Sequence, residues 1–367
     1  DWDGQPTGNT LSLAGSATVH SLTGARNLYV LSRLEHTLMA VDGASLNPGP
    51  VTPLGVELRD LVVDHSRGQI YVNDSASRLY AVDMSGVQQG KLAVERSALV
   101  GSGELLLDAA GETLLVSQMG GDPNQVGVVD AGSLRVTQVI TGGSLVALDT
   151  RRARAIVSSP VNLYPPFAGR TYVWDLARQE LVGVIEEGGK PAYNPLRDEI
   201  YLVGYSCHVY DAGTLERTDS LTPDIDAQLC PGCTGQPAVA DIGIYPALNA
   251  VVLHMTVTNA GKGGGVLPAP RVLTLDTLQP LTHTLTILPT HSGEYLVWPA
   301  IDGRVYEQVS SWRQVPRTNL VVRDAQSGEI LSWRDGLSLE MLAPESGMGF
   351  VEYNGQWLAL DTASWTP

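Results

Sequence analysis

Short runs of apolar residues, each bounded by Gly, Asp, Asn or Ser, follow one another along almost the whole chain. Two stretches, residues 58–99 and 104–142, each contain four such runs in the same order. The runs cover residues 58–66, 70–74, 78–83 and 91–99 in the first stretch, and 104–111, 112–117, 126–130 and 135–142 in the second. Runs of this length predict β-strands, and no long helical period separates them. The pattern predicts an all-β chain made of four-stranded antiparallel units.

An aspartate ends the third apolar run of each unit, as in LYAVD at Asp83 and VGVVD at Asp130. The aligned set is Asp42, Asp83, Asp130, Asp175, Asp211, Asp276, Asp324 and Asp361. Successive members lie 36 to 65 residues apart, a spacing typical of propeller blades. Because a side chain that recurs in every unit is not a unique catalyst, we predict that these carboxylates accept hydrogen bonds from backbone amides of the following turn.

The units resemble the bacterial YVTN-type, WD40-like β-propeller repeat. The segments that carry the resemblance are IYVND with LYAVD, LLVSQ with VGVVDAGSL, and IYLVG with CHVYDAGTL. The resemblance covers nearly the whole chain. It implies a β-propeller of four-stranded blades and says little about function.

Seven full units can be traced between about residues 16 and 336, and an eighth, ending in QWLALD, has only three strands. One strand at about residues 10–15 is left over at the start of the chain. Placing it at the outer edge of the last blade closes the ring and removes unpaired edges. We therefore predict a single β-propeller domain over residues 1–367 with eight blades. Seven blades are the alternative, if the first or sixth unit is divided differently.

The formal net charge of −16 disfavours nucleic acid as a partner, because the chain repels phosphate backbones. No apolar run approaches the roughly 18 residues of a membrane-spanning helix. The chain begins at Asp1, without a signal-peptide core, which favours a processed protein or an excised domain of a larger polypeptide or assembly.

Long polar loops are predicted on one face, here called the top face, where the second strand of a unit leads to the third and the fourth leads to the next unit. The longest occupy residues 118–125, 158–170, 222–238, 256–271 and 308–317. Long loops on a rigid scaffold commonly carry binding sites. Aromatic and cationic residues favoured in recognition surfaces lie there, and the predicted binding set is Tyr164, Phe167, Arg170, Lys262, Arg271, Trp312, Arg313 and Arg317. The alternative is that these loops only cover the channel mouth.

The three cysteines are Cys207, Cys230 and Cys233. We predict a disulfide from Cys207 to Cys230 or Cys233, which would tie the loop after the fifth unit to its own blade and would suit an extracellular, periplasmic or cell-surface location. A zinc site that also uses His208 is the alternative, and adjacent strand residues that point to opposite faces disfavour it.

Motifs of catalysis are missing from the sequence, which lacks His-Glu-x-x-His, a Gly-x-Ser-x-Gly elbow and a phosphate-binding loop. Candidates on inner strands are His20, Asp60, Asp64, Asp108, Asp149, Asp241 and Glu294, of which Asp64, Asp108 and Asp149 recur at one turn. The sequence therefore predicts a non-catalytic binding or scaffolding propeller, without cofactor or metal, that recognises a protein, glycan or other ligand. A propeller enzyme of lyase, lactonase or quinoprotein type, with its site at the channel mouth, is the alternative.

Overall fold

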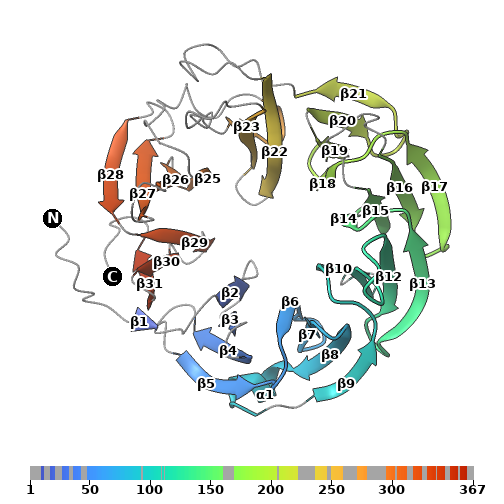
Figure 1. Cartoon of the computed structure of the whole chain (residues 1–367), viewed down its shortest axis with the longest axis horizontal. Coiled ribbons are helices and arrows are strands. Elements are labelled where there is room, and N and C mark those ends of the chain that lie inside the picture. The colour runs from blue at the N-terminus through green and yellow to red at the C-terminus, as the bar shows by residue number, and fades with distance from the viewer. Residues whose placement is uncertain are drawn as a thin grey trace. The chain divides into compact units, whose positions relative to one another are not determined.

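The computed structural model describes most of the chain (Figure 1). The described residues are 10–11, 17–20, 27–32, 36–42, 48–91, 94–108, 110, 112–159, 169–204, 206–221, 236–245, 249–258, 271–278, 295–301, 304–311, 317–324, 329–335, 337–343, 348–353 and 356–361.

Four-stranded antiparallel sheets follow one another along the chain, as the apolar pattern predicts. The first three sheets consist of β2 (Ala17–His20), β3 (Asn27–Ser32), β4 (Thr37–Asp42) and β5 (Pro48–Pro53); β6 (Leu58–Asp64), β7 (Gln69–Asp74), β8 (Arg78–Asp83) and β9 (Val94–Leu99); and β10 (Leu105–Asp108), β11 (Thr113–Ser117), β12 (Gln125–Asp130) and β13 (Arg135–Thr141). The strands of each sheet pair in sequence order.

The fourth and fifth sheets continue the same order, and the described residues of the sixth form a three-stranded sheet. They consist of β14 (Leu145–Asp149), β15 (Arg154–Ser158), β16 (Thr171–Asp175) and β17 (Glu180–Ile185); β18 (Lys190–Asn194), β19 (Glu199–Val203), β20 (Cys207–Asp211) and β21 (Arg217–Ser220); and β22 (Gln236–Tyr245), β23 (Ala250–Thr258) and β24 (Arg271–Thr274). The seventh sheet consists of β25 (Tyr295–Ile301), β26 (Arg304–Ser311), β27 (Arg317–Asp324) and β28 (Ile330–Asp335).

The eighth sheet combines the two ends of the chain. It consists of β29 (Ser338–Ala343), β30 (Met348–Tyr353), β31 (Gln356–Asp361) and β1 (Thr10–Leu11). β1 pairs antiparallel with β31, with Thr10 opposite Leu358 and Leu11 opposite Trp357. This pairing confirms that the N-terminal strand completes the last sheet. The described residues form eight sheets, while a count of eight blades stays a prediction.

Buried apolar side chains pack between consecutive sheets. One cluster joins Tyr29 and Leu38 of the first sheet to Leu61 and Ile70 of the second. Corresponding clusters join the second sheet to the third, the fourth to the fifth, and the fifth to the sixth. Because the middle strands bury both faces, β7 has all six residues buried. The packing explains why the second and third runs of each unit are the most apolar in the sequence.

The chain clusters into two compact parts. One contains residues 1–146, 175–180 and 339–367, and the other contains residues 147–174 and 181–338. The sequence pattern gave no sign of this division.

A short helix, α1 (Met84–Gln88), interrupts the second unit between β8 and β9, where the sequence predicts only a turn. Asp83 caps it, since its carboxylate accepts a hydrogen bond from the Gly86 amide at 2.6 Å. Five residues are too few for a periodic pattern to reveal such a helix. Val87 is fully buried in the cluster between the first two sheets and holds the helix there.

Candidate functional site

The predicted binding residues fall unevenly on the described chain. Arg170 is described with its side chain, and Arg271 and Arg317 are described as backbone at the first positions of β24 and β27. Outside the described residues lie Tyr164, Phe167, Lys262, Trp312 and Arg313, together with Cys230 and Cys233. The described part of the candidate site therefore consists of the strand ends from which the long loops leave.

The top edge of the fourth sheet holds both ends of the segment that contains Tyr164 and Phe167. β15 ends at Ser158 and β16 begins at Thr171. The Ser159 amide donates to the Arg170 carbonyl at 3.0 Å, and the Arg170 amide donates to Ser159 Oγ at 2.9 Å. These two bonds close the segment at its base.

A second set of contacts joins this base to the connection between β17 and β18. Ser158 Oγ lies 2.8 Å from Thr171 Oγ1 and accepts a hydrogen bond from the Gly189 amide at 3.1 Å. Thr171 Oγ1 donates to the Glu187 carbonyl at 2.7 Å. The backbones approach closely here, because a Cβ atom on Gly169 would lie 2.6 Å from Gly188 Cα. We call the group Ser158, Ser159, Gly169, Arg170, Thr171, Gly188 and Gly189 the loop base.

Charged side chains stand on the solvent side of the loop base. Arg170 Nε pairs with Glu186 Oε2 at 2.8 Å, and both side chains are exposed, at 58% and 70%. The exposed Arg170 guanidinium can donate two parallel hydrogen bonds to a polar ligand, and the Glu186 carboxylate beside it can accept hydrogen bonds from that ligand.

A half-buried polar cluster lies beside the loop base. Glu187 accepts a hydrogen bond from Tyr210 Oη and contacts His208 Nδ1 through its other carboxylate oxygen. His208 and Tyr210 are two residues apart on β20 and so share one face. Burial and the Glu187 carboxylate raise the pKa of the Tyr210 hydroxyl, so Tyr210 stays a neutral donor. From the sequence, His208 was predicted only as an alternative zinc ligand, and Glu187 was not predicted. The available signal for Glu187 was its position before Gly188 and Gly189 in a connection between units.

Cys207 points away from this cluster into the core between the fifth and sixth sheets. Its side chain is fully buried and packs with Val209 and Val239. Burial, with a smaller contribution from Glu187, raises the pKa of Cys207 to about 12. The opposite orientations of Cys207 and His208 agree with the strand argument against a shared zinc site. The disulfide to Cys230 or Cys233 stays a prediction, since both lie outside the described residues.

One long top-face loop, residues 118–125, is described completely and folds onto itself. The Gly121 amide donates to the Gln118 carbonyl at 3.1 Å, and the Asp122 amide donates to the Met119 carbonyl at 3.0 Å. Asp122 Oδ1 accepts a hydrogen bond from the Asn124 amide at 2.8 Å. Internal hydrogen bonds of this kind give a loop a defined shape, which a recognition surface requires.

The repeating aspartates lie at the opposite edge of the sheets, and four of them act as predicted. Asp130 accepts from the Ser133 amide at 2.7 Å, and Asp83, Asp175 and Asp211 accept from amides two or three residues further on. Hydrogen bonds from Ser133 hold the pKa of Asp130 below its usual value. These carboxylates are turn-forming groups.

The structure of the sixth unit shows that the alignment of repeating aspartates is wrong at Asp276. The Leu278 amide donates to the Thr274 carbonyl at 2.8 Å, as the amide of Leu215 does to the carbonyl of Asp211. Thr274, and not Asp276, is therefore the structural counterpart of the repeating aspartates. Thr274 replaces a turn carboxylate by a hydroxyl, so an alignment on Asp selected a residue two positions too late.

A second carboxylate set also forms turns at this edge, between the first and second strands. Asp149 Oδ1 accepts from the Arg151 and Arg152 amides, and Asp64 Oδ1 accepts from the Arg67 amide. Asp149 and Asp64 are each 1% exposed. Their role in turns confirms the structural interpretation of Asp64 and Asp149 from the sequence.

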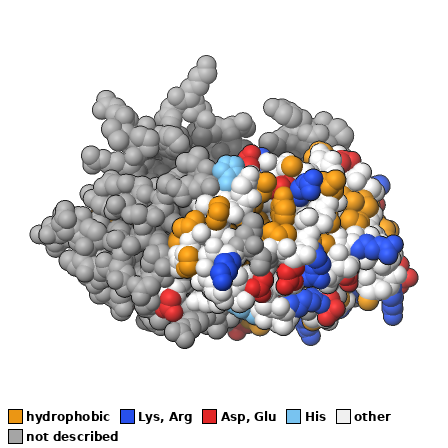
Figure 2. Space-filling view, turned by 90° about the horizontal axis from the view of Figure 1, so that it is seen from below, with side chains coloured by type: hydrophobic (Ala, Val, Ile, Leu, Met, Phe, Trp, Pro, Cys, Tyr) orange, Lys and Arg blue, Asp and Glu red, His pale blue; other side chains and the backbone are white. Residues whose placement is uncertain are grey.

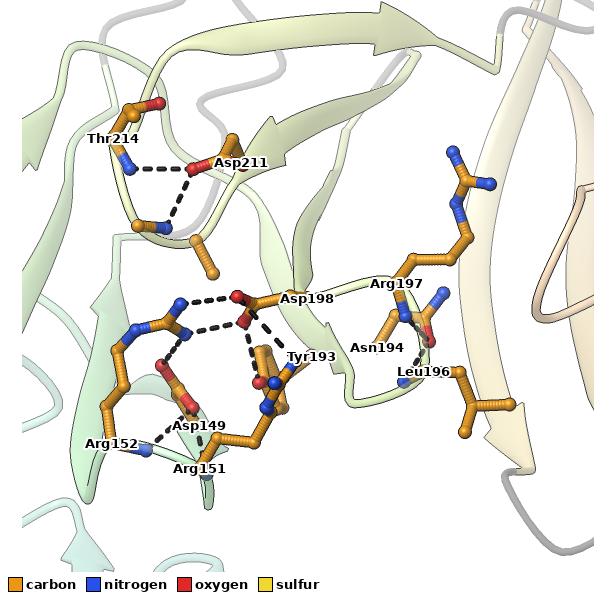
Figure 3. A network of polar contacts seen from close by, with 12 residues as sticks. Asp149, Arg151, Arg152, Tyr193, Asn194, Leu196, Arg197, Asp198, Asp211 and Thr214 are labelled. Carbon is orange, nitrogen blue, oxygen red and sulfur yellow. Dashed lines mark hydrogen bonds and ion pairs between the residues drawn. The ribbon is translucent and has the colours of Figure 1, made fainter.

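The arginines of these turns join consecutive sheets (Figure 3). Arg152 contacts Asp149 at 3.1 Å and forms a bidentate ion pair with Asp198 of the fifth sheet. Arg67 similarly contacts Asp64 at 3.1 Å and Glu112 of the third sheet at 2.6 Å. A paired, partly buried network that recurs from sheet to sheet is explained by packing and does not require a ligand.

Asp60 and Asp108 are the remaining inner-strand carboxylates with described side chains. Asp108 ends β10 and is 5% exposed, and Asp60 is used by the fold. Its Oδ2 atom accepts from the Leu105 amide of the third sheet at 2.8 Å. Asn73 accepts from the Asp60 amide and donates to the Gly103 carbonyl at 2.6 Å. Asn73 is fully buried, so these hydrogen bonds satisfy its side chain within the core. His20 and Asp241 are described as backbone only, and Glu294 lies outside the described residues.

Within the described part of the chain, no three His, Cys, Asp or Glu side chains are placed to hold a metal ion. No helix in the same residues combines the length and apolarity needed to span a membrane. On the described part of the face shown in Figure 2, basic and acidic side chains are interspersed. Such a mixture lacks the single-sign stripe that follows a nucleic-acid backbone.

Comparison with known proteins supports the fold and leaves the family open. No protein-family model matches the chain, and no curated protein matches it in sequence. Among solved structures, BamB from Moraxella catarrhalis is similar with a TM-score of 0.59 and 11% identity over 95% of this chain and 96% of that one. The C-terminal WD40 domain of Sif2 is similar with a TM-score of 0.61 and 11% identity over 96% of both chains. The chain thus has an all-β fold of four-stranded antiparallel sheets that matches β-propeller structures.

Proposed function

We propose that this protein is a non-catalytic binding or scaffolding β-propeller that recognises a protein or glycan through its top-face loops. The observation that carries the proposal is the loop base, where hydrogen bonds from Ser158, Ser159 and Thr171 hold both ends of the segment with Tyr164 and Phe167. Aromatic side chains presented from a rigid base bind with little loss of conformational freedom.

Exposed charge at the loop base supports recognition of a polar partner. Arg170 and Glu186 together offer hydrogen-bond donors and acceptors beside the aromatic segment, a mixture common at the rims of protein and glycan interfaces. Of the remaining predicted residues, Arg271 and Arg317 begin β24 and β27, and Lys262, Trp312 and Arg313 precede these strands in the sequence.

We further propose an extracellular, periplasmic or cell-surface location, and a repeat related to the YVTN type. The acidic net charge supports a partner other than nucleic acid.

The test compares loop variants against arrays of glycans and displayed protein fragments. One variant replaces residues 160–168 with a short Gly-Ser linker, and Leu196→Ser changes an exposed turn at the opposite edge as the control. We expect the wild type and Leu196→Ser to bind the same ligands and the folded loop variant to lose them. Equal binding by all three proteins would refute the proposal.

The second candidate is a propeller enzyme, and the pair of His208 and Glu187 is the observation that favours it. A histidine whose Nδ1 atom contacts a carboxylate is oriented as in many general bases. Lyase, lactonase and quinone-dependent dehydrogenase assays would test it with the wild type, with His208→Gln and with Tyr210→Phe. Turnover that disappears in His208→Gln would favour this candidate over the binding function.

A further inference from the structure

The outer strand β17 differs from the other outer strands of the protein. It is the last strand of its sheet, and three of its side chains are exposed apolar groups: Leu181 at 44%, Val182 at 38% and Val184 at 36%. Most other outer strands contain prolines or charged residues that discourage pairing: Pro48, Pro50 and Pro53 in β5, Glu95 and Arg96 in β9, Arg135 in β13, Arg217 and Asp219 in β21, Arg271 in β24, and Arg334 and Asp335 in β28. The two-residue strand β1 has neither, and the one charged residue of β17 is Glu180 at its first position. The segment from Leu181 to Ile185 contains neither.

We propose that β17 pairs antiparallel with β17 of a second copy of this chain, forming a two-fold symmetric dimer through one continuous sheet. The charged residues at the two ends of β17 indicate that its pairing partner is a second copy of the same strand. Arg178 precedes the strand and its side chain is 74% exposed, while Glu186 follows the strand and its side chain is 70% exposed. Antiparallel self-pairing brings each arginine to the partner's glutamate, twice per dimer.

Two-fold symmetry limits which residues of the two β17 strands can lie opposite one another. A two-fold axis perpendicular to the sheet keeps every side chain on its own face, so opposing residues are both even-numbered or both odd-numbered. Placing Val182 opposite Val182 of the partner subunit brings Arg178 near Glu186 of the partner subunit. Of the two neighbouring registers, the one with Gly183 on the axis places Glu180 opposite Glu186 of the partner subunit, and directly opposed like charges are destabilising. The one with Leu181 on the axis places Arg178 opposite Val184 of the partner subunit and forms no ion pair between the strands. The Val182 register is therefore the expected one.

Apolar contacts support the same register. On one face Val182 meets its symmetry mate, with Val184 beside it. On the other face Leu181 lies opposite Gly183 of the partner subunit, where it meets Leu215, because a Cβ atom on Gly183 would lie 2.6 Å from Leu215 Cδ1. Cross-strand apolar pairs of this kind stabilise a sheet, and removing the unpaired edge adds backbone hydrogen bonds.

Two features limit the affinity. Glu186 already pairs with Arg170 at 2.8 Å and Arg178 with Glu180 at 3.6 Å within the chain, so the contact between the two copies joins existing ion pairs. Each copy also carries a net charge of −16, although salt screens charges beyond about 8 Å at physiological ionic strength. A short strand interface of this kind is expected to be reversible, with a dissociation constant in the micromolar range.

Charge reversal tests the proposal by sedimentation equilibrium over a range of protein concentrations. Arg178→Glu and Glu186→Arg each place like charges opposite one another, and each should raise the dissociation constant at least about tenfold. The double variant R178E/E186R restores opposite charges and should return it close to the wild-type value. Val182→Lys places two ammonium groups on the axis and should abolish the dimer. Circular dichroism and thermal melting establish that each variant is folded.

Disulfide cross-linking between the two copies tests the register. It uses a variant in which Cys230→Ser and Cys233→Ser remove the other cysteines that could cross-link. Val182→Cys should form an intermolecular disulfide on mild oxidation, because residue 182 faces itself. Val184→Cys, equally exposed, is the matched control and should not, since residue 184 faces residue 180. A monomer at every concentration, assembly beyond a dimer, a dimer unaffected by either charge reversal, or cross-linking through residue 184 alone would each overturn the proposal. The dimer should persist when residues 160–168 are replaced, which separates it from the top-face function.

Discussion

At the residue scale, a carboxylate at a strand end acts through the few backbone amides that follow it. Asp83 accepts from the Gly86 amide and the Ser85 hydroxyl, and hydrogen bonds from Ser85 and Gly86 keep its pKa below the usual value. Asp83→Ala should lower the free energy of unfolding by about 1 kcal/mol, the contribution of a helix cap. Urea denaturation measures the change, and Asp83→Asn, which can still cap, is the control. A change in ligand binding without a change in stability would contradict the turn role.

The ion pair between Arg152 and Asp198 makes the free energy of unfolding depend on pH. Hydrogen bonding to Arg152 lowers the pKa of Asp198 to about 2. An unfolded aspartate titrates at about 3.9, so this contribution is complete above about pH 5 and is lost as the pH falls toward 2. We expect it to be on the order of 1–2 kcal/mol, since both side chains are partly solvated.

Asp198→Asn tests this contribution by urea denaturation between pH 2 and pH 7. The stability difference from the wild type should be largest at neutral pH and should shrink toward pH 2. Asp175→Asn, whose carboxylate accepts from the Arg178 amide in an exposed turn, is the control and should show a smaller dependence. A stability difference for Asp198→Asn that is constant with pH would exclude the ion pair as the cause.

Residue roles were predictable where one turn geometry recurs, and not where tertiary contacts select the partner. The turn function of Asp130 follows from its repetition in the sequence. Nothing in the sequence places Glu187 against His208 and Tyr210, because these residues come from neighbouring sheets. The shift from Asp276 to Thr274 was hidden for a related reason, since a hydroxyl and a carboxylate can begin the same turn.

At the element scale, β1 links the N-terminus to the last strand of the chain. Only Thr10 and Leu11 pair with β31, yet this pairing covers an edge that would otherwise be open. Deleting residues 1–16 should lower the melting temperature by several degrees, which corresponds to about 1–2 kcal/mol for a chain of this size. Deleting residues 1–8, which leaves β1 intact, is the control. Equal melting temperatures for the two truncations would argue against a stabilising role for β1.

The order of strands was accessible from the sequence because apolar runs and turn residues alternate regularly. The helix α1 was not, since one turn of helix carries no period. The exposed edge of β17 was equally hidden. An apolar fourth strand has the same pattern as a buried one, and only the paired sheet reveals that β17 lies at its edge.

Cys207 poses an element-scale question, whether the segment that follows β21 is tied to its own sheet. Peptide mapping under non-reducing conditions should recover Cys207 linked to Cys230 or Cys233, with the other cysteine free. Denaturation before alkylation is required, because the thiol is fully buried and its raised pKa keeps it protonated. Three free thiols would remove the disulfide and weaken the proposal of an exported location, while stoichiometric zinc would favour a metal site.

At the scale of the whole molecule, net charge and local ion pairs respond to salt in opposite directions. Self-repulsion at −16 destabilises the folded state and is screened by salt, whereas the pairs of Arg67 and Arg152 are partly buried and are screened less. The repulsion should therefore dominate, and the melting temperature at pH 7 should rise with sodium chloride. Near the isoelectric point of about 4.7 the repulsion vanishes, so the same salt should leave the melting temperature unchanged or lower it. Differential scanning calorimetry at the two pH values measures both slopes, and a melting temperature that falls with salt at pH 7 would show that local pairs outweigh the net charge.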